Sequence, residues 1–154
     1  LSAAPDDENI VFSAGLGYQK MGRAQEAMAC YKKVIALNPD SARAHANLGA
    51  VYYAAGRIQE AFSAWQEAVR LDPQAGEVRA NLGVAYFQAG RYQEARASLL
   101  EAIEKSPRFL PAYAHLILVD RKLGLEPEAK ETLQKALEID PSFETTFKEL
   151  LSGA

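Results

Sequence analysis

The sequence has little of the material from which catalytic and metal sites are built. It contains one cysteine, Cys30, and two histidines, His45 and His115. A single cysteine excludes an intrachain disulfide and any metal site with several cysteine ligands. Neither histidine has a second ligand at helical spacing, so we expect no metal, no cofactor and no catalytic triad. We therefore expect a protein that is not an enzyme, with Cys30 serving as a small core residue.

Long apolar runs and a surplus of positive charge are also missing. No stretch approaches the ~18 consecutive apolar residues of a membrane-spanning helix, so we expect no membrane insertion. The formal net charge is −3, which argues against a nucleic-acid partner. The sequence does not determine the compartment. Its abundant alanine, with arginine at the loops, is typical of GC-rich bacterial genomes, so we expect a soluble protein of the bacterial cytoplasm or periplasm.

The sequence does contain a six-residue motif that repeats at a fixed interval. Gly-Arg-x-Gln-Glu-Ala begins at Gly22, Gly56 and Gly90, and a degenerate copy, Gly-Leu-Glu-Pro-Glu-Ala, begins at Gly124. Each copy starts 34 residues after the one before it (56 − 22 = 34). A fixed period of this length indicates stacked supersecondary units, which usually present a binding surface.

Further columns appear when the repeats are counted from Glu8, Ala42, Gly76 and Leu110. Position 20 is always alanine and position 32 is always proline. Position 8 is glycine and position 11 is tyrosine in the first three repeats, but the fourth has Ile117 and Asp120 there. The loop glycines supply the left-handed backbone that ends one helix. The prolines close the next helix, because proline has no N–H to continue it.

These columns resemble the tetratricopeptide repeat, a helix–turn–helix unit of the same length. The resemblance implies an all-α fold, an α-solenoid in which antiparallel helices A and B stack into a right-handed superhelix with the A helices on its concave face. It implies four repeats, at residues 8–41, 42–75, 76–109 and 110–143.

The two ends of the array have their own signals. Asp6-Asp7-Glu8 is typical of the cap and first turn of a helix. Residues 1–7 resemble the end of an upstream repeat, because Leu1 and Pro5 fall in the aliphatic and proline columns. A bare apolar face on the first repeat would be the structural sign of such a truncation. Residues 144–154 are expected to form a capping helix with Phe147, Leu150 and Leu151 on one face, or else the start of a docking helix or a continuing array.

Ligands of tetratricopeptide arrays usually lie in the concave groove, against fixed positions of the A helices. Carried onto this sequence, those positions imply a peptide-binding groove made by Asn9, Phe12, Leu16, Lys20, Arg43, Asn47, Ala50, Tyr53, Asn81, Val84, Phe87, His115, Leu118, Arg121 and Lys122.

The groove positions carry a positive surplus on an acidic chain. Lys20, Arg43, Arg121 and Lys122 outnumber Glu77. Such a surplus attracts acidic segments. The alternative is that these charges are solvated and inert.

Aromatic and amide side chains give the groove further chemistry. Phe12, Tyr53 and Phe87 offer contact area of the kind that dominates interfaces, unless they only pack against neighbouring helices. Asn47 and Asn81 share position 6 of successive repeats and resemble the asparagine ladder by which some relatives hold a peptide backbone. In the divergent fourth repeat, we expect Asp120 to form a local ion pair with Arg121 or Lys122; a role in specificity is the alternative.

The sequence therefore predicts a non-enzymatic protein–protein interaction scaffold that binds a peptide or partner-protein segment in the concave groove. The expected partner segment is apolar with acidic residues. Two alternatives stay open: a module that self-associates by end-to-end stacking, and the non-catalytic arm of a larger enzyme such as a glycosyltransferase.

Overall fold

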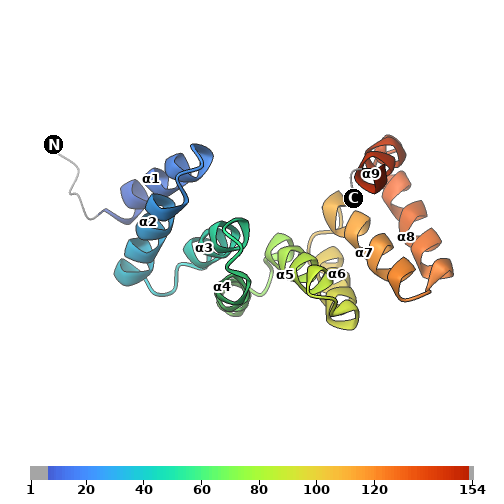
Figure 1. The fold of residues 1–154 in the computed structure, drawn as a ribbon, viewed down its shortest axis with the longest axis horizontal. Coiled ribbons are helices and arrows are strands. Elements are labelled where there is room, and N and C mark those ends of the chain that lie inside the picture. Colours follow the sequence, from blue (N-terminus) through green and yellow to red (C-terminus); the bar gives the residue numbers. More distant parts are fainter. Residues whose placement is uncertain (1–6, 153–154) are drawn as a thin grey trace. The chain divides into compact units, whose positions relative to one another are not determined.

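The computed structural model of the protein describes residues 7–152, apart from the side chains of residues 146 and 149–152. Nine α-helices and no strands occur in this range (Figure 1), which confirms the predicted all-α repeat fold. The helices are α1 (Glu8–Lys20), α2 (Ala24–Leu37), α3 (Ala42–Ala54), α4 (Ile58–Leu71), α5 (Gly76–Gln88), α6 (Tyr92–Lys105), α7 (Leu110–Lys122), α8 (Glu126–Ile139) and α9 (Phe143–Ser152).

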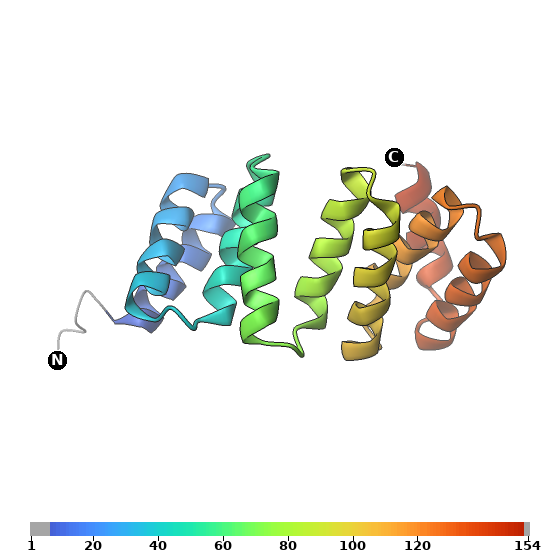
Figure 2. The ribbon, with the colours of Figure 1, turned by 90° about the horizontal axis from the view of Figure 1, so that it is seen from below.

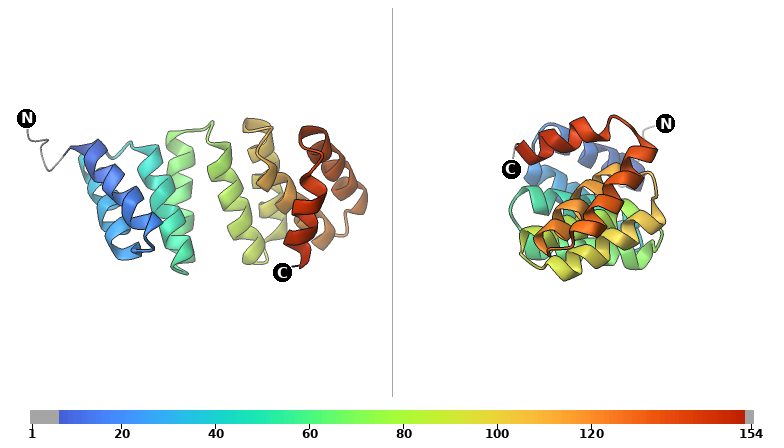
Figure 3. Two further views of the ribbon diagram at one scale, coloured as in Figure 1. Left: turned by 90° about the horizontal axis from the view of Figure 1, so that it is seen from above. Right: turned by 90° about the vertical axis from the view of Figure 1, so that its right-hand side faces the viewer.

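The helices fall into two compact units, one ending at Gln74 and the other beginning at Ala75. In the first unit, α2 packs against both α1 and α3, and α3 packs against α4 (Figure 2). In the second unit, α5, α6 and α7 pack together, α8 packs against α7, and α9 packs against α8 (Figure 3). The odd-numbered helices α1, α3, α5 and α7 are the A helices, and α2, α4, α6 and α8 are the B helices.

Each A helix ends at a loop glycine in the left-handed conformation, as the sequence predicted. The backbone angle φ is between 71° and 75° at these glycines, where a side chain would be strained. The residue after each glycine donates its N–H back across the loop, for example from Arg23 to the carbonyl of Tyr18 at 2.9 Å. This bond satisfies a carbonyl that the end of the helix would otherwise leave unpaired. The four glycines are Gly22, Gly56, Gly90 and Gly124.

The glycine column at position 8 exists because a large B-helix side chain lies directly on the A-helix backbone. A Cβ added to Gly49 would come within 2.5 Å of the Trp65 ring, and one added to Gly83 within 2.6 Å of Leu99. The A and B helices of a repeat therefore cross closely at position 8, where the contacting B-helix residue is at position 24 of the repeat. In the fourth repeat Ile117 replaces the glycine and is itself buried.

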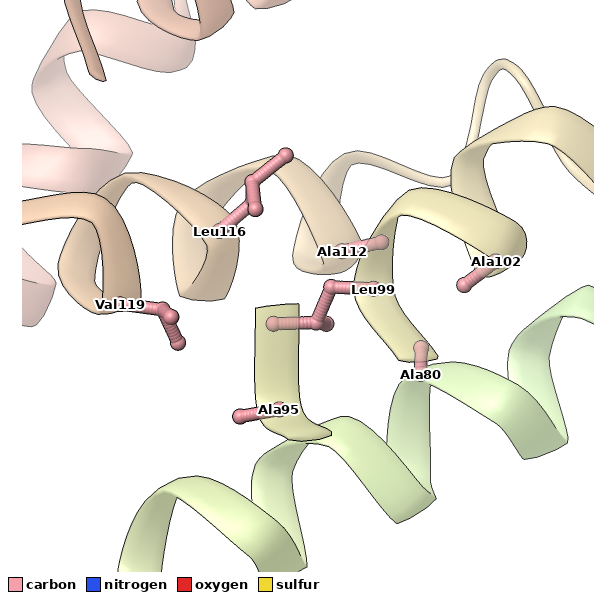
Figure 4. Close-up of a cluster of buried hydrophobic side chains, with 7 residues drawn as sticks. All are labelled: Ala80, Ala95, Leu99, Ala102, Ala112, Leu116 and Val119. Carbon is pink, nitrogen blue, oxygen red and sulfur yellow. The ribbon is translucent and has the colours of Figure 1, made fainter. Parts of the chain in front are cut away.

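Within each unit, the core continues from a B helix to the A helix that follows it, from α2 to α3 and from α6 to α7. In the second unit, α6 contributes Ala95, Leu99 and Ala102 to a buried cluster that α7 completes with Ala112, Leu116 and Val119. Leu99 is fully buried at the centre of this cluster (Figure 4). Burial of such a side chain stabilises the fold by about 1.5–3 kcal/mol.

The ends of the described chain are held by different means. Asp7 caps α1, as predicted, because its carboxylate accepts from the backbone N–H groups of Asn9 at 2.9 Å and Ile10 at 3.3 Å. At the other end, Phe143 and Phe147 of α9 are buried in a cluster with side chains of α7 and α8. The predictions for residues 1–6 and for the Leu150 and Leu151 side chains lie outside the described part of the chain.

Candidate functional site

In the first unit, the groove residues at the start of the A helices bind one another. The Arg43 guanidinium donates to the Asn9 side-chain oxygen at 2.8 Å and lies 4.1 Å from the centre of the Phe12 ring. Phe12 is only 8% exposed, and its ring packs against Tyr31. The expectation that Phe12 offers contact area to a ligand is therefore wrong. Arg43, although exposed, already has an amide and an aromatic ring as partners.

The predicted groove residues further along α3 also contact other side chains of the first unit. The Tyr31 hydroxyl donates to Gln19 at 2.8 Å, and burial raises the pKa of Tyr31. A hydrogen bond from Asn47 opposes that rise in pKa, so the Asn47 amide is engaged with Tyr31. The half-buried Tyr53 packs its ring against Trp65, and Ala50 is half-buried. On this unit, Leu16 and Lys20 are the predicted groove residues that stand exposed without such commitments.

In the second unit, groove residues gather around a surface hollow of ≈ 310 Å³. Phe87 lies at the end of α5, Leu118, Arg121 and Lys122 lie near the end of α7, and Glu126 is the first residue of α8. The sequence predicted four of these residues and missed Glu126. The signal for Glu126 is its place at the start of the fourth B helix, directly after the loop that follows the two cations.

The cations of this hollow are weakly paired. Arg121 Nε lies 4.0 Å from Glu126 Oε1, and both side chains are about half exposed. Lys122 is exposed and has no ion-pair partner among the described residues. Beside them, Phe87 and Leu118 are half-buried and apolar. The hollow thus combines two apolar side chains with two cations and the Glu126 carboxylate.

The remaining groove residues of the second unit line its A helices. Asn81 and Val84 on α5 are half-buried, as is His115 on α7. The Nδ1 atom of His115 lies 2.9 Å from the carbonyl oxygen of Pro111. Because a carbonyl oxygen can only accept, Nδ1 donates the hydrogen in this contact.

Asp120 does not pair with its sequence neighbours, so the predicted local ion pair is wrong. Its side chain is buried, and Oδ1 accepts a hydrogen bond from Arg96 Nε of α6 at 2.7 Å. Position 11 of an A helix faces the preceding B helix, whereas Arg121 and Lys122, one and two residues further on, are rotated away from it. The available signal was Arg96 itself, since the first two repeats have Met28 and Phe62 at the same position.

A larger hollow of ≈ 420 Å³ lies in the first unit, and its acidic side chains are already paired with arginines. Its lining includes His45, Tyr52, Glu60 and Glu67. Arg57 and Arg70 hydrogen-bond to the two glutamates and hold their pKa values below the usual range. Among the described residues no group of three histidine, cysteine, aspartate or glutamate side chains could hold a metal ion. None of the described helices is long and apolar enough to cross a membrane.

Family profiles agree with the repeat architecture. One profile, for the TPR repeat, matches residues 15–56. Another, for the tetratricopeptide repeat, matches residues 53–118 and 87–152, which is more than half of the chain. The chain belongs to the tetratricopeptide repeat family. Protein–protein interaction is the usual role of this family.

Solved structures of other tetratricopeptide proteins share this fold. A crystal structure of MamA matches with a TM-score of 0.84 and 28% identity, over 94% of this chain and 85% of that one. PilF of Pseudomonas aeruginosa matches with a TM-score of 0.80 and 28% identity, over 88% of this chain and 62% of its own. MamA of Desulfovibrio magneticus RS-1 has a TM-score of 0.79 at 21% identity, over 90% and 78%, which shows the fold alone. Among curated protein sequences, none matches the chain.

Proposed function

We propose that the protein is a non-enzymatic scaffold that binds a peptide or partner-protein segment on its A-helix face, anchored in the hollow of the second unit. The observation that carries this proposal is the hollow itself, in which Arg121 and Lys122 lie beside the apolar side chains of Phe87 and Leu118. Glu126 reaches Arg121 only at 4.0 Å, and Lys122 has no ion-pair partner among the described residues, so the positive charge beside this apolar surface is suited to a ligand that supplies negative charge.

The size and chemistry of the hollow define the segment that fits. Its volume of ≈ 310 Å³ suits a bulky side chain. A leucine or phenylalanine of the partner would lie on Phe87 and Leu118, which are contributed by α5 and α7. An adjacent aspartate or glutamate would meet Arg121, whose guanidinium can hold a carboxylate through two parallel hydrogen bonds. The proposed partner segment is therefore apolar with acidic residues beside the anchor.

The two units contribute unequally in this proposal. Arg43 of the first unit is stacked on Phe12 and bonded to Asn9, so its charge is partly used within the fold. Asn81 of α5 lies on the same helix as Phe87 and is available to hold a ligand backbone. The second unit therefore provides the main contacts, and Leu16 and Lys20 of the first unit provide a secondary surface.

The leading test compares the loss of the two cations at the hollow with the loss of one cation in the first unit. Peptides selected from a random library, and synthetic peptides with leucine or phenylalanine flanked by acidic residues, would be titrated against the wild type and Arg121→Ala/Lys122→Ala. We expect the double variant to weaken binding by at least tenfold, about 1.4 kcal/mol. Arg43→Ala is the matched control and should change the affinity less than twofold. Equal effects of the two variants, or no peptide bound at all, would contradict the proposal.

A further variant pair separates the hollow from the asparagine ladder. Asn81→Ala removes an amide on α5, and Asn47→Ala removes one that is bound to Tyr31. If peptides are held by their backbone, Asn81→Ala should weaken every selected peptide by a similar factor, whatever its side chains are. If only Arg121→Ala/Lys122→Ala matters, the hollow acts alone and the ladder hypothesis is wrong.

A further inference from the structure

One face of α1 differs from the equivalent faces of α3 and α7. Positions 3, 7, 10 and 11 of an A helix form the face that meets the preceding B helix. On α3 and α7, which pack against α2 and α6, no residue of this face is more than 7% exposed. These buried residues are Ala44, Leu48, Val51 and Tyr52 on α3, and Ala112, Leu116, Val119 and Asp120 on α7.

The same positions of α1 are open. Ile10 is 44% exposed, Ala14 is exposed, and Gly17 and Tyr18 are half-buried. A Cβ added to Gly17 would meet no atom within 4 Å, whereas one added to Gly15, two residues earlier, would strike the Tyr31 ring. Within the described part of the first unit, no helix therefore packs on this face, and Arg23 of the following loop lies over its Tyr18 ring. Met21, one turn beyond Gly17, extends it with a side chain that is 63% exposed.

The equivalent interfaces within the chain show what kind of element covers such a face. In the second unit, Ala95, Leu99 and Ala102 of the B helix α6 pack against Ala112, Leu116 and Val119 of α7. In the first unit, α2 covers α3 in the same way. The occupant that suits the α1 face is thus a B helix with a small–large–small apolar stripe. Because α1 has its bulky residue at position 3 and small ones at positions 7 and 10, that helix needs its larger side chains opposite Ala14 and Gly17.

We propose that the open face of α1 is a repeat–repeat interface that takes the B helix of a tetratricopeptide repeat preceding Glu8 in the same polypeptide. The repeat columns support this source of the helix. Pro5 lies 34 residues before Pro39 (39 − 5 = 34), and Leu1 lies the same distance before Ile35, in the aliphatic column of the B helix.

A second copy of the chain is a poorer occupant. End-to-end stacking would require the last B helix, α8, to present its outer side to α1 of the next copy. Phe143 and Phe147 of α9 are instead buried against the α7–α8 cluster within the same chain. The last B helix therefore already has α9 packed against it, whereas none of the described helices covers the open face of α1.

The test adds the missing helix and measures its coupling to the α1 face. A copy of Glu8–Asp40 replaces residues 1–6, which preserves the 34-residue period and the Asp7 cap. Ile10→Lys is then made in the parent chain and in the extended chain, and urea unfolding is followed by circular dichroism. We expect Ile10→Lys to change the unfolding constant at least tenfold more in the extended chain than in the parent. Leu16→Lys, on the groove side of the same helix, is the control and should act equally in both.

A second variant and a measurement of dimerisation distinguish the possible outcomes. Gly17→Gln should leave the parent at least as stable as the wild type and lower the unfolding midpoint of the extended chain. Equal effects of Ile10→Lys in both chains, with the added helix folded by circular dichroism, would overturn the proposal. So would a parent chain that dimerises in sedimentation and loses the dimer on Ile10→Lys, since the occupant would then be a second copy. None of these outcomes depends on peptide binding by the hollow.

Discussion

The junction between the first two repeats and the junction between the last two solve the same packing problem with different chemistry. In the first, Tyr52 lies beneath the Arg57 guanidinium, 4.6 Å from it, and Arg57 also reaches the Met28 sulfur at 3.6 Å. In the last, the equivalent of Tyr52 is Asp120, whose buried carboxylate is bonded to Arg96. A buried ion pair depends on both partners, whereas apolar packing degrades gradually. The two junctions should therefore respond differently to mutation.

The same contrast explains where free charge appears on the surface. In each of the first three repeats, the loop arginine lies over the position-11 tyrosine and binds the glutamate three residues later. The fourth repeat has Leu125 in place of this arginine. Its cations are instead Arg121 and Lys122, at the end of the A helix and beside the hollow. At its loop, the divergent repeat thus lacks the arginine that the other repeats stack on a tyrosine.

The largest expected effect comes from removing one partner of the buried pair. Arg96→Met leaves the Asp120 carboxylate buried without its partner. A fully buried pair broken in this way typically costs about 3–5 kcal/mol, and because the Arg96 side chain is 30% exposed we expect about 2–4 kcal/mol. Urea unfolding of the full chain measures the loss.

A double variant tests whether the junctions are interchangeable. Arg96→Met with Asp120→Tyr copies Met28 and Tyr52 of the first junction, so it should recover most of the stability that Arg96→Met loses. A double variant as unstable as the single one would show that the last junction is shaped for the ion pair alone.

A smaller effect is expected from two glycines that differ only in their surroundings. Gly49→Ala places a methyl group against Trp65, which is also held by a hydrogen bond from its Nε1 to the Ala46 carbonyl at 3.0 Å. Overpacking of this kind costs about 1–3 kcal/mol. Gly17→Ala meets open space in a helix and should stabilise the protein by about 0.5–1 kcal/mol. Thermal unfolding of the two variants should shift in opposite directions, and shifts of the same sign would contradict the packing described for position 8.

The period of the sequence was enough to predict the helices and the loops, because those features depend on residues within one repeat. Gly56 ends its helix through its own positive φ, and Asp7 caps the helix that directly follows it. The same columns placed Phe87, Leu118, Arg121 and Lys122 on the surface that forms the hollow.

The errors concern side chains whose partners lie in another repeat. Arg96 reaches Asp120 across a helix junction, and Arg43 reaches Asn9 across 34 residues. A column comparison aligns equivalent residues but does not say which long side chain extends to which neighbour. The prediction that Phe12 offers contact area was wrong for the same reason, because Arg43 of the next repeat lies over its ring.

The smallest expected effect concerns the loop arginine, which the fourth repeat lacks. In the third repeat, Arg91 donates two hydrogen bonds to Glu94, and these hold the pKa of Glu94 below its ordinary value near 4.5. Arg91→Ala should raise the pKa of Glu94 toward that value, as measured by carbon-detected NMR titration of the side-chain carboxyl. Glu26, which has its own arginine, serves as the internal control and should keep its pKa.

The lowered pKa of Glu94 also predicts how the effect of Arg91→Ala on stability changes with pH. Because the folded state lowers the pKa of Glu94, the pairing stabilises the protein above the ordinary glutamate pKa, and the contribution disappears as the pH falls through the lowered value. The difference in Tm between the wild type and Arg91→Ala should therefore be largest near neutral pH and shrink on acidification. It should not vanish, because Arg91 also lies 4.7 Å from the Tyr86 ring centre and that contact does not titrate with Glu94. A difference in Tm that stays the same at low pH would mean that the ion pair contributes nothing and that stacking alone holds the loop.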